Sequence, residues 1–212
     1  MNLPRIYPIL DVRLLQARGC PVETAAAALL ESGAAILQIR HKGPWTQDLF
    51  DEARRISEMC GSTGAQLVIN DRADIAMLLD AGLHVGQDDL PPDEARRLIG
   101  GTAVLGLSTH NAQQLCAAVK APVSYVALGP MFATQSKENP DPVVGTARLA
   151  EWRRLIDRPL VAIGGITRAN AASVLEAGAD SLAVIGDLFP GECTARSIAE
   201  RMNDWHRTIG VR

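Results

Sequence analysis

The sequence predicts an α/β fold, a single (β/α)8 TIM barrel over residues 1–212 with its active site at the C-terminal ends of the strands. Three observations support this prediction. Short apolar segments alternate with helical patterns eight times. The chain has 212 residues, a length that one α/β barrel can fill. No GxGxxG turn follows the first apolar segment, although such a turn is common in an open doubly wound sheet, the alternative fold.

The predicted strands are short and rich in Val, Ile, Leu and Ala. Continuous apolar runs are typical of parallel strands that are buried on both faces. They occupy residues 6–11, 36–42, 66–71, 83–87, 103–109, 125–130, 159–165 and 181–187.

The segments between the strands carry apolar residues three and four positions apart, which predicts helices. The repeated junctions ESGA, DAGL and EAGA place Gly where a helix can end in the left-handed conformation. The predicted helices occupy residues 21–33, 47–60, 74–82, 91–100, 112–120, 147–156, 169–178 and 194–206.

Composition excludes several classes of protein. The formal charge of -3 argues against a nucleic-acid partner, because such binding needs a basic surface. The apolar runs are too short for a membrane span or a secretory signal. The four cysteines form no CxxC pair, so we expect reduced thiols in a cytoplasmic protein. The oligomeric state stays open, with a homo-oligomer among the alternatives.

Polar residues gather where the predicted strands end. Gln38, Arg40 and Lys42 alternate along one strand, and alternate side chains of a strand point the same way. Asp71 and Asp89 follow the next two strands. Salt bridges alone would explain these charges. A metal–diphosphate site would explain them together, with the cations on phosphate oxygens and the two acids on Mg²⁺.

Two later segments indicate an anion site. Gly164 and Gly165 end the seventh predicted strand, just before a helix, where backbone N–H groups can approach a phosphate. The long loop after the sixth strand carries Thr134, Ser136 and Lys137, which could bind a second anion or close over the first.

The histidines carry less information. Those at positions 41, 84 and 206 have no evident partner in the sequence and are interpreted as structural or exposed.

Seven segments, in order from about residue 36 to 187, resemble the motifs of the thiamine-phosphate synthase family. They are LQIRHK, VINDRADIA, LHVGQDDL, LGLSTHN, GPMFATQSK, AIGGIT and the end of the eighth strand. The resemblance implies a Mg²⁺-dependent transferase in the form of a (β/α)8 barrel. Its substrates would be 4-amino-2-methyl-5-(diphosphooxymethyl)pyrimidine and 4-methyl-5-(2-phosphoethyl)thiazole or its carboxylated form, and its products thiamine monophosphate and diphosphate.

The resemblance also implies roles for individual residues. Contacts with the pyrimidine diphosphate would come from Gln38, Arg40, Lys42, Asn70, Ser108 and Lys137. Among these, the catalytic residues would be Arg40, Lys42, Ser108 and Lys137. Mg²⁺ would lie on Asp71 and Asp89. The thiazole phosphate would be bound by Thr134, Gln135, Ser136, Gly165, Ile185 and Gly186.

The sequence departs from the family pattern in three places. His41 stands where an acid is usual, Gly186 where Ser is common, and ATQSK replaces the commoner P-T-x-T-K. Three alternative functions remain. A thiazole tautomerase with the same barrel would use His110 as its acid–base residue, but such relatives tend to lack the acid pair. Another phosphate-binding barrel would lack the QxRxK strand end, and a non-catalytic paralogue would have lost its metal ligands.

Overall fold

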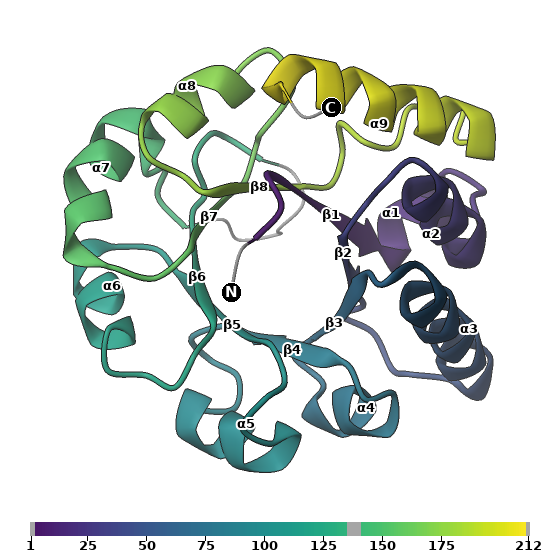
Figure 1. Ribbon diagram of the computed structural model, residues 1–212, viewed down its shortest axis with the longest axis horizontal. Coiled ribbons are helices and arrows are strands. Elements are labelled where there is room, and N and C mark those ends of the chain that lie inside the picture. Colours follow the sequence, from purple (N-terminus) through teal and green to yellow (C-terminus); the bar gives the residue numbers. More distant parts are fainter. Residues whose placement is uncertain (1–2, 135–140, 211–212) are drawn as a thin grey trace.

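A closed barrel of parallel strands forms the centre of the protein in the computed structural model, which describes residues 3–134 and 141–210. Each strand pairs with the next in chain order, and β1 pairs with β8 to close the ring (Figure 1). The predicted (β/α)8 barrel is thereby confirmed, and the open sheet is wrong. The strands are β1 Ile6–Asp11, β2 Ile36–Arg40, β3 Gln66–Asn70, β4 Gly82–Val85, β5 Leu105–Thr109, β6 Tyr125–Leu128, β7 Leu160–Ile163 and β8 Ser181–Val184.

Helices surround this ring and connect successive strands (Figure 1). Within residues 3–134 and 141–210, no helix is both long enough and apolar enough to span a membrane. The helices are α1 Val12–Ala17, α2 Val22–Glu31, α3 Gln47–Thr63, α4 Ala73–Leu78, α5 Pro92–Ile99, α6 Ala112–Ala118, α7 Gly145–Trp152, the 3₁₀ turn η1 Arg153–Leu155, α8 Ala171–Glu176 and α9 Ala195–Ile209.

Helix α1 was not predicted. It spans six residues directly after β1, and the Asp11 carboxylate caps it by accepting a hydrogen bond from Leu14 N at 3.0 Å. A helix of under about two turns has too few positions to show the apolar period that marks longer helices. The local cap, rather than a periodic pattern, therefore defines this element.

Six predicted strands are too long at their C-terminal ends, and for β2, β7 and β8 the difference moves predicted site residues into loops. β2 ends at Arg40, so Lys42 lies in the following loop, and strand alternation does not fix its direction. β7 ends at Ile163 and β8 at Val184, which places the glycines that follow in loops. After β7 and β8 the pairing between strands stops before the glycines that the sequence marked as functional, whereas on β2 Gln38 and Arg40 are still paired and only Lys42 lies beyond the ladder.

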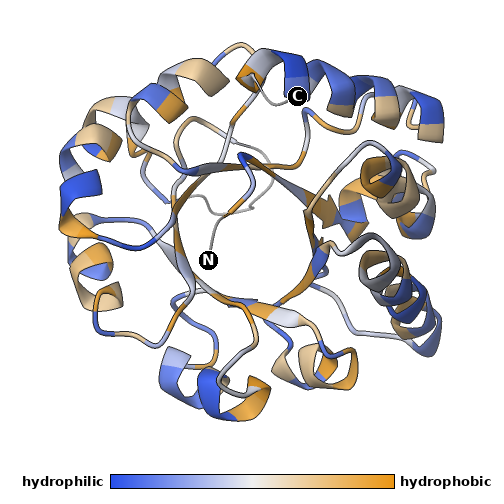
Figure 2. Ribbon diagram, in the orientation of Figure 1, coloured by the Kyte–Doolittle hydropathy of each residue, from blue (hydrophilic) through white to orange (hydrophobic). Residues whose placement is uncertain are grey.

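Two apolar layers hold the barrel together. The larger lies between strands and helices, and Figure 2 shows hydrophobic colour along the strands with hydrophilic colour on the outward surfaces of α3 and α9. Helix α9 buries Ile198, Met202, Trp205 and Ile209 at helical spacing. The smaller layer fills the barrel interior with residues from six of the strands, namely Tyr7, Ile9, Ile36, Val68, Tyr125, Ala127, Val161 and Ala183.

Gly106 gives a test of interior packing. A Cβ there would lie 2.2 Å from Tyr125 Cζ and 2.4 Å from His84 Nδ1, both inside the barrel. We expect Gly106→Ala to lower the free energy of unfolding by about 1–3 kcal/mol, because the rings must shift. Urea denaturation measures the change. The matched control is Gly61→Ala on α3, where a Cβ meets nothing within 4 Å and Ala should raise stability by about 0.5–1 kcal/mol. Equal stability of Gly106→Ala and the unaltered protein would contradict the packing.

Candidate active site

An ion pair joins the ends of β1 and β2. The register places Asp11 beside Arg40, and the Arg40 guanidinium donates to the Asp11 carboxylate. Both side chains are largely buried, at 20% and 9% exposed. Since Asp11 also caps α1, it is fixed from two directions and holds Arg40 at the mouth of the barrel. Sequence reasoning missed Asp11, although it ends the segment IYPILD much as Asp71 follows its own strand.

A second ion pair lies at the next strand end. Lys42, in the loop after β2, donates to the carboxylate of Asp71, which follows β3. Asp71 has a φ of 64°, in the left-handed region that non-glycine residues rarely occupy, and its N–H donates to His84 O at 2.8 Å. Strained backbone of this kind is concentrated at functional sites. The backbone here fixes the acid, whereas the Lys42 side chain is 55% exposed and can move.

The two predicted metal ligands, Asp71 and Asp89, are adjacent. Burial and a hydrogen bond with Asp89 raise the pKa of Asp71, and Lys42 only partly opposes them. Burial acts on Asp89 in the same direction, but its hydrogen bonds with Asp71 and with Gly86 N, the latter at 2.7 Å, lower its pKa. Two carboxyls that share a hydrogen bond in this way repel each other once both are ionised, so the pair attracts a cation.

This pair fits Mg²⁺ better than a metal that needs a complete protein cage. In the described part of the chain, no group of three or more His, Cys, Asp or Glu side chains could hold a metal. Mg²⁺ commonly takes one or two carboxylates and fills its other positions with water and substrate phosphate. Asp71 and Asp89 are therefore sufficient as protein ligands if a phosphorylated substrate supplies the rest.

A chain of hydrogen bonds crosses the barrel interior and reaches the mouth at Ser108. Gln38 Nε2 donates to the Tyr7 hydroxyl at 3.1 Å, and this hydroxyl lies 2.9 Å from that of Tyr125. His84 bridges onward, with Nδ1 2.9 Å from Tyr125 Oη and Nε2 2.8 Å from Ser108 Oγ. His84 was interpreted from the sequence as structural or exposed, and the structure buries it among partners that the sequence did not reveal. Burial lowers its pKa to about 4, so the ring is neutral near pH 7.

Asn70, the last residue of β3, presents an unused donor. It is 6% exposed, and its side-chain Nδ2 has no hydrogen-bond partner among the described residues. Buried donors without a partner are rare and indicate a missing water or ligand. Its place next to Asp71 agrees with the expectation that Asn70 contacts a substrate.

The glycines after β7 allow the β6 loop to approach. Gly164 and Gly165 have φ angles of 96° and 65°. A Cβ on Gly165 would lie 2.6 Å from Ala133 O, and Phe132 N donates to Gly164 O at 3.0 Å. The glycine pair thus makes room for the loop that carries Thr134.

Helix α8 begins at Ala171, slightly later than predicted. It follows a turn in which Asn170 Nδ2 donates to Gly165 O at 3.0 Å.

The remaining residues predicted for the thiazole phosphate are only partly described. Ile185 and Gly186 form a turn after β8, in which Leu188 N donates to Ile185 O at 3.2 Å. A Cβ on Gly186 would meet nothing within 4 Å, so the Ser common in the family would fit. Gln135, Ser136 and Lys137 lie outside the described residues.

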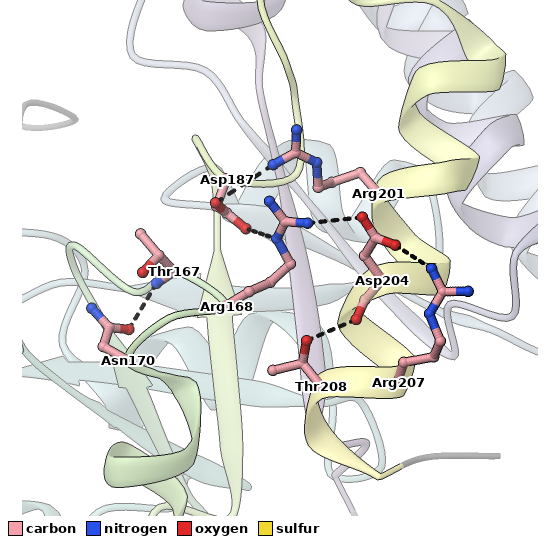
Figure 3. Close-up of polar contacts among 8 residues, drawn as sticks. All are labelled: Thr167, Arg168, Asn170, Asp187, Arg201, Asp204, Arg207 and Thr208. Carbon is pink, nitrogen blue, oxygen red and sulfur yellow. Dashed lines mark hydrogen bonds and ion pairs between the residues drawn. The ribbon is translucent and has the colours of Figure 1, made fainter.

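Charged residues connect the turns after β7 and β8 to helix α9 (Figure 3). Arg168 lies between two acids, with Nε 3.1 Å from Asp187 Oδ2 and Nη1 2.8 Å from Asp204 Oδ2. Arg201 approaches the other oxygen of Asp187 at 3.7 Å, and Arg207 pairs with Asp204. Arg168 and Asp187 belong to the turns that follow Gly165 and Gly186, so the network couples the two turns. No local pattern marks this network, because Arg168 is 19 and 36 residues away from the two acids that it joins.

His110, the acid–base residue of the tautomerase alternative, has its own contacts. Its Nδ1 donates to Gly129 O at 2.7 Å, since a carbonyl can only accept. Its Nε2 lies 3.6 Å from Asp141 Oδ2. The Ser108 hydroxyl is hydrogen-bonded to His84 and not to His110, so Ser108 and His110 belong to separate hydrogen-bond networks.

Comparisons with known proteins identify the family. A family model described as thiamine monophosphate synthase matches residues 6–188. The thiamine-phosphate synthase of Koribacter versatilis is 46% identical over 89% of this chain and 90% of its own length, and that of Agrobacterium fabrum is 38% identical over 97% and 93%. The structure of a thiamine phosphate pyrophosphorylase from Pyrococcus furiosus matches with a TM-score of 0.82 and 27% identity over 97% of both chains. The chain therefore belongs to the thiamine monophosphate synthase family.

Proposed function

We propose that this chain couples 4-amino-2-methyl-5-(diphosphooxymethyl)pyrimidine with 4-methyl-5-(2-phosphoethyl)thiazole to give thiamine monophosphate and diphosphate. With the carboxylated form of the thiazole, CO₂ is released as a third product. Family membership supports the reaction type, as do relatives that bear this name. The observation that carries the proposal is the adjacent pair Asp71 and Asp89 beside Lys42 at the barrel mouth. This set suits a Mg²⁺-bound diphosphate, and a reaction without a diphosphate substrate would not need it.

The reaction is a dissociative substitution in this proposal. The CH₂–O bond breaks first, its electron pair leaves on the diphosphate oxygen, and the aminopyrimidine stabilises the cation left behind. The thiazole nitrogen then donates its lone pair to form the new C–N bond. The protein needs no covalent nucleophile, only electrostatic stabilisation and alignment of the two substrates.

The residues at β2 to β5 would act on the departing diphosphate. Arg40 and Lys42 would bind phosphate oxygens, and Asn70 would use its unpaired N–H groups. Asp71 and Asp89 would hold Mg²⁺, which when bound supplies positive charge to the leaving group. Ser108 would add a hydroxyl contact. Lys137, assigned from the sequence motif alone, would add a further cation.

The loops after β6, β7 and β8 would bind the thiazole phosphate. Gly165 exposes backbone there, and Gly186 leaves open space where its Cβ would be. Thr134 would contribute from the β6 loop, with Gln135 and Ser136 beside it in the sequence. This division would place the two substrates on opposite arcs of the mouth, so that the thiazole nitrogen could approach the carbon opposite the departing diphosphate.

The direct experiment is to incubate the purified protein with both substrates and Mg²⁺ and to measure thiamine monophosphate and diphosphate in equal amounts. A parallel reaction with a chelator in place of Mg²⁺ should give little product. Absence of thiamine monophosphate with Mg²⁺ and both substrates present would overturn the proposal.

The acid pair gives the first functional prediction. Asp71→Asn and Asp89→Asn should each lower turnover by at least about 100-fold, because diphosphate departure loses its counter-charge. The fold should persist, since Asn tolerates the left-handed conformation of Asp71. Turnover is measured against Mg²⁺ concentration. The control is Asp88→Asn, an exposed neighbour of Asp89, which should keep normal turnover. Full activity of both acid-pair variants without added metal would contradict the assignment.

A second prediction separates the synthase from the tautomerase alternative. His110→Ala should keep substantial formation of thiamine monophosphate, because bond cleavage needs no imidazole base. Arg40→Ala should lose most of it, since the variant removes a cation from the mouth and leaves Asp11 without its partner. Product formation is measured with both substrates saturating. An inactive His110→Ala together with a fully active Arg40→Ala would favour proton transfer instead.

A third prediction concerns the network in Figure 3. Arg168→Ala should raise the KM for the thiazole phosphate severalfold and leave the KM for the pyrimidine diphosphate nearly unchanged, because only the turns after β7 and β8 lose their connection. Steady-state kinetics with each substrate varied in turn gives both values. Arg207→Ala is the control, as Arg207 binds the same Asp204 from α9, is 77% exposed, and contacts neither turn. Equal shifts in both KM values for Arg168→Ala would argue against separate binding regions for the pyrimidine diphosphate and the thiazole phosphate.

A further inference from the structure

We propose that His84 is a positioning residue that donates its Nε2–H to Ser108 Oγ and so turns the hydroxyl hydrogen of Ser108 toward an acceptor atom of the bound substrate. The inference deepens the proposed function and depends on it for the role of Ser108. It assigns the order of donors in the buried hydrogen-bond chain, which starts at Gln38 and ends at Ser108.

The order is set at the Gln38 end. Gln38 is 3% exposed, and its amide Nε2 lies 3.1 Å from the Tyr7 hydroxyl. An amide nitrogen can only donate, so the Tyr7 oxygen is an acceptor in this bond. The single hydrogen of that hydroxyl must therefore go to another partner. The Tyr125 hydroxyl, at 2.9 Å, is the partner that the structure provides.

The same count of donor hydrogens fixes the remaining hydrogen bonds between Tyr125, His84 and Ser108. Tyr125 accepts from Tyr7, and its own single hydrogen can go only to a different atom. His84 Nδ1 lies 2.9 Å from the Tyr125 oxygen and accepts that hydrogen. A neutral imidazole has one N–H, so Nδ1 as acceptor leaves the hydrogen on Nε2. Nε2 then donates to Ser108 Oγ at 2.8 Å.

Packing prevents the imidazole from turning over. Its plane stacks on the Tyr125 ring, with centroids 5.6 Å apart and an interplanar angle of 25°. Gly106 packs against both rings, and a Cβ there would lie 2.4 Å from His84 Nδ1 and from the Tyr125 hydroxyl. The space around the imidazole is therefore filled. The ring is 6% exposed, so water does not compete for its nitrogens. The orientation of His84 is thus fixed by the barrel and not by a ligand.

The order of donors decides what the Ser–His pair can do. A serine beside a histidine suggests a nucleophile and its base, but a base needs a free lone pair toward the serine. Here Nε2 carries the hydrogen, so His84 cannot remove the Ser108 proton. Ser108 instead accepts from His84 and keeps its hydroxyl hydrogen for an outward bond. The ligand atom opposite Ser108 must accept, as a phosphate oxygen does, and the bond strengthens as negative charge grows on the departing diphosphate.

A spectroscopic measurement tests the order without the reaction. In protein with ¹⁵N-labelled histidine, long-range ¹H–¹⁵N correlation near neutral pH should find His84 with a protonated Nε2 and an unprotonated Nδ1. The His84 signals are assigned by their absence in His84→Gln. Tyr125→Phe, which removes the hydrogen donated to Nδ1, should shift the Nδ1 resonance. A protonated Nδ1 in the unaltered protein would overturn the proposal, whatever the activity.

Kinetics tests whether His84 acts through Ser108. His84→Leu should lower kcat by about tenfold because the donor to Ser108 is lost. His84→Gln, which can place an amide N–H near the same point, should recover most of kcat. In a Ser108→Ala background, His84→Leu should have no further effect. Additive losses, or a Gln variant as impaired as the Leu variant, would overturn the proposal. An Nε2–H tautomer in a protein that forms no thiamine monophosphate would instead overturn the proposed function and leave the order of donors intact.

Discussion

Closure of the barrel is the constraint on which the interior and the site depend. Eight parallel strands that close on themselves leave no free edge and bury both faces. A polar side chain that points into the barrel interior is cut off from water, so its partners must come mainly from other inward side chains. Tyr7, Tyr125 and Gln38 do so, from strands far apart in the sequence. Because one unsatisfied buried group costs about 1–3 kcal/mol, the members of this set restrict one another to few arrangements.

The same constraint explains why the charges gather at one end. Strand ladders stop at Arg40, Asn70 and Thr109, and beyond these points side chains can reach water and ligands. The C-terminal ends of all parallel strands lie on one side, so polar residues that are distant in the sequence become neighbours there. The adjacency of Asp71 and Asp89 arises in this way, from β3 and β4 pairing in register. Two acids that repel each other are tolerated because Lys42 and the Gly86 amide partly offset the repulsion.

The sequence was informative wherever a feature has a local cause. Apolar runs and helical periods predicted the strands and most helices, and the position of Asp71 and Asp89 after consecutive strands predicted their adjacency. It failed where a contact joins distant segments. His84 sits in an apolar strand, and its partners Tyr125 and Ser108 are separated from it by 41 and 24 residues. Asp11 was overlooked because its partner Arg40 lies 29 residues away and the helix that it caps is short. Arg168 likewise gains its meaning only from Asp187 and Asp204.

The two ion pairs at the mouth differ in how freely they can rearrange when a substrate arrives. The Lys42 side chain is 55% exposed, so it keeps its contact with water when it moves, but the Asp71 carboxylate is only 18% exposed and needs a replacement cation when Lys42 leaves. Arg40 and Asp11 are mostly buried, and separating them would leave a buried charge without its partner. Under the proposed function, a cation on Asp71 and Asp89 would release Lys42 toward the diphosphate, while Arg40 would bind phosphate without leaving Asp11. Substrate and metal would thus bind cooperatively. The metal would free Lys42 from Asp71, and the diphosphate would draw Lys42 away from the metal site.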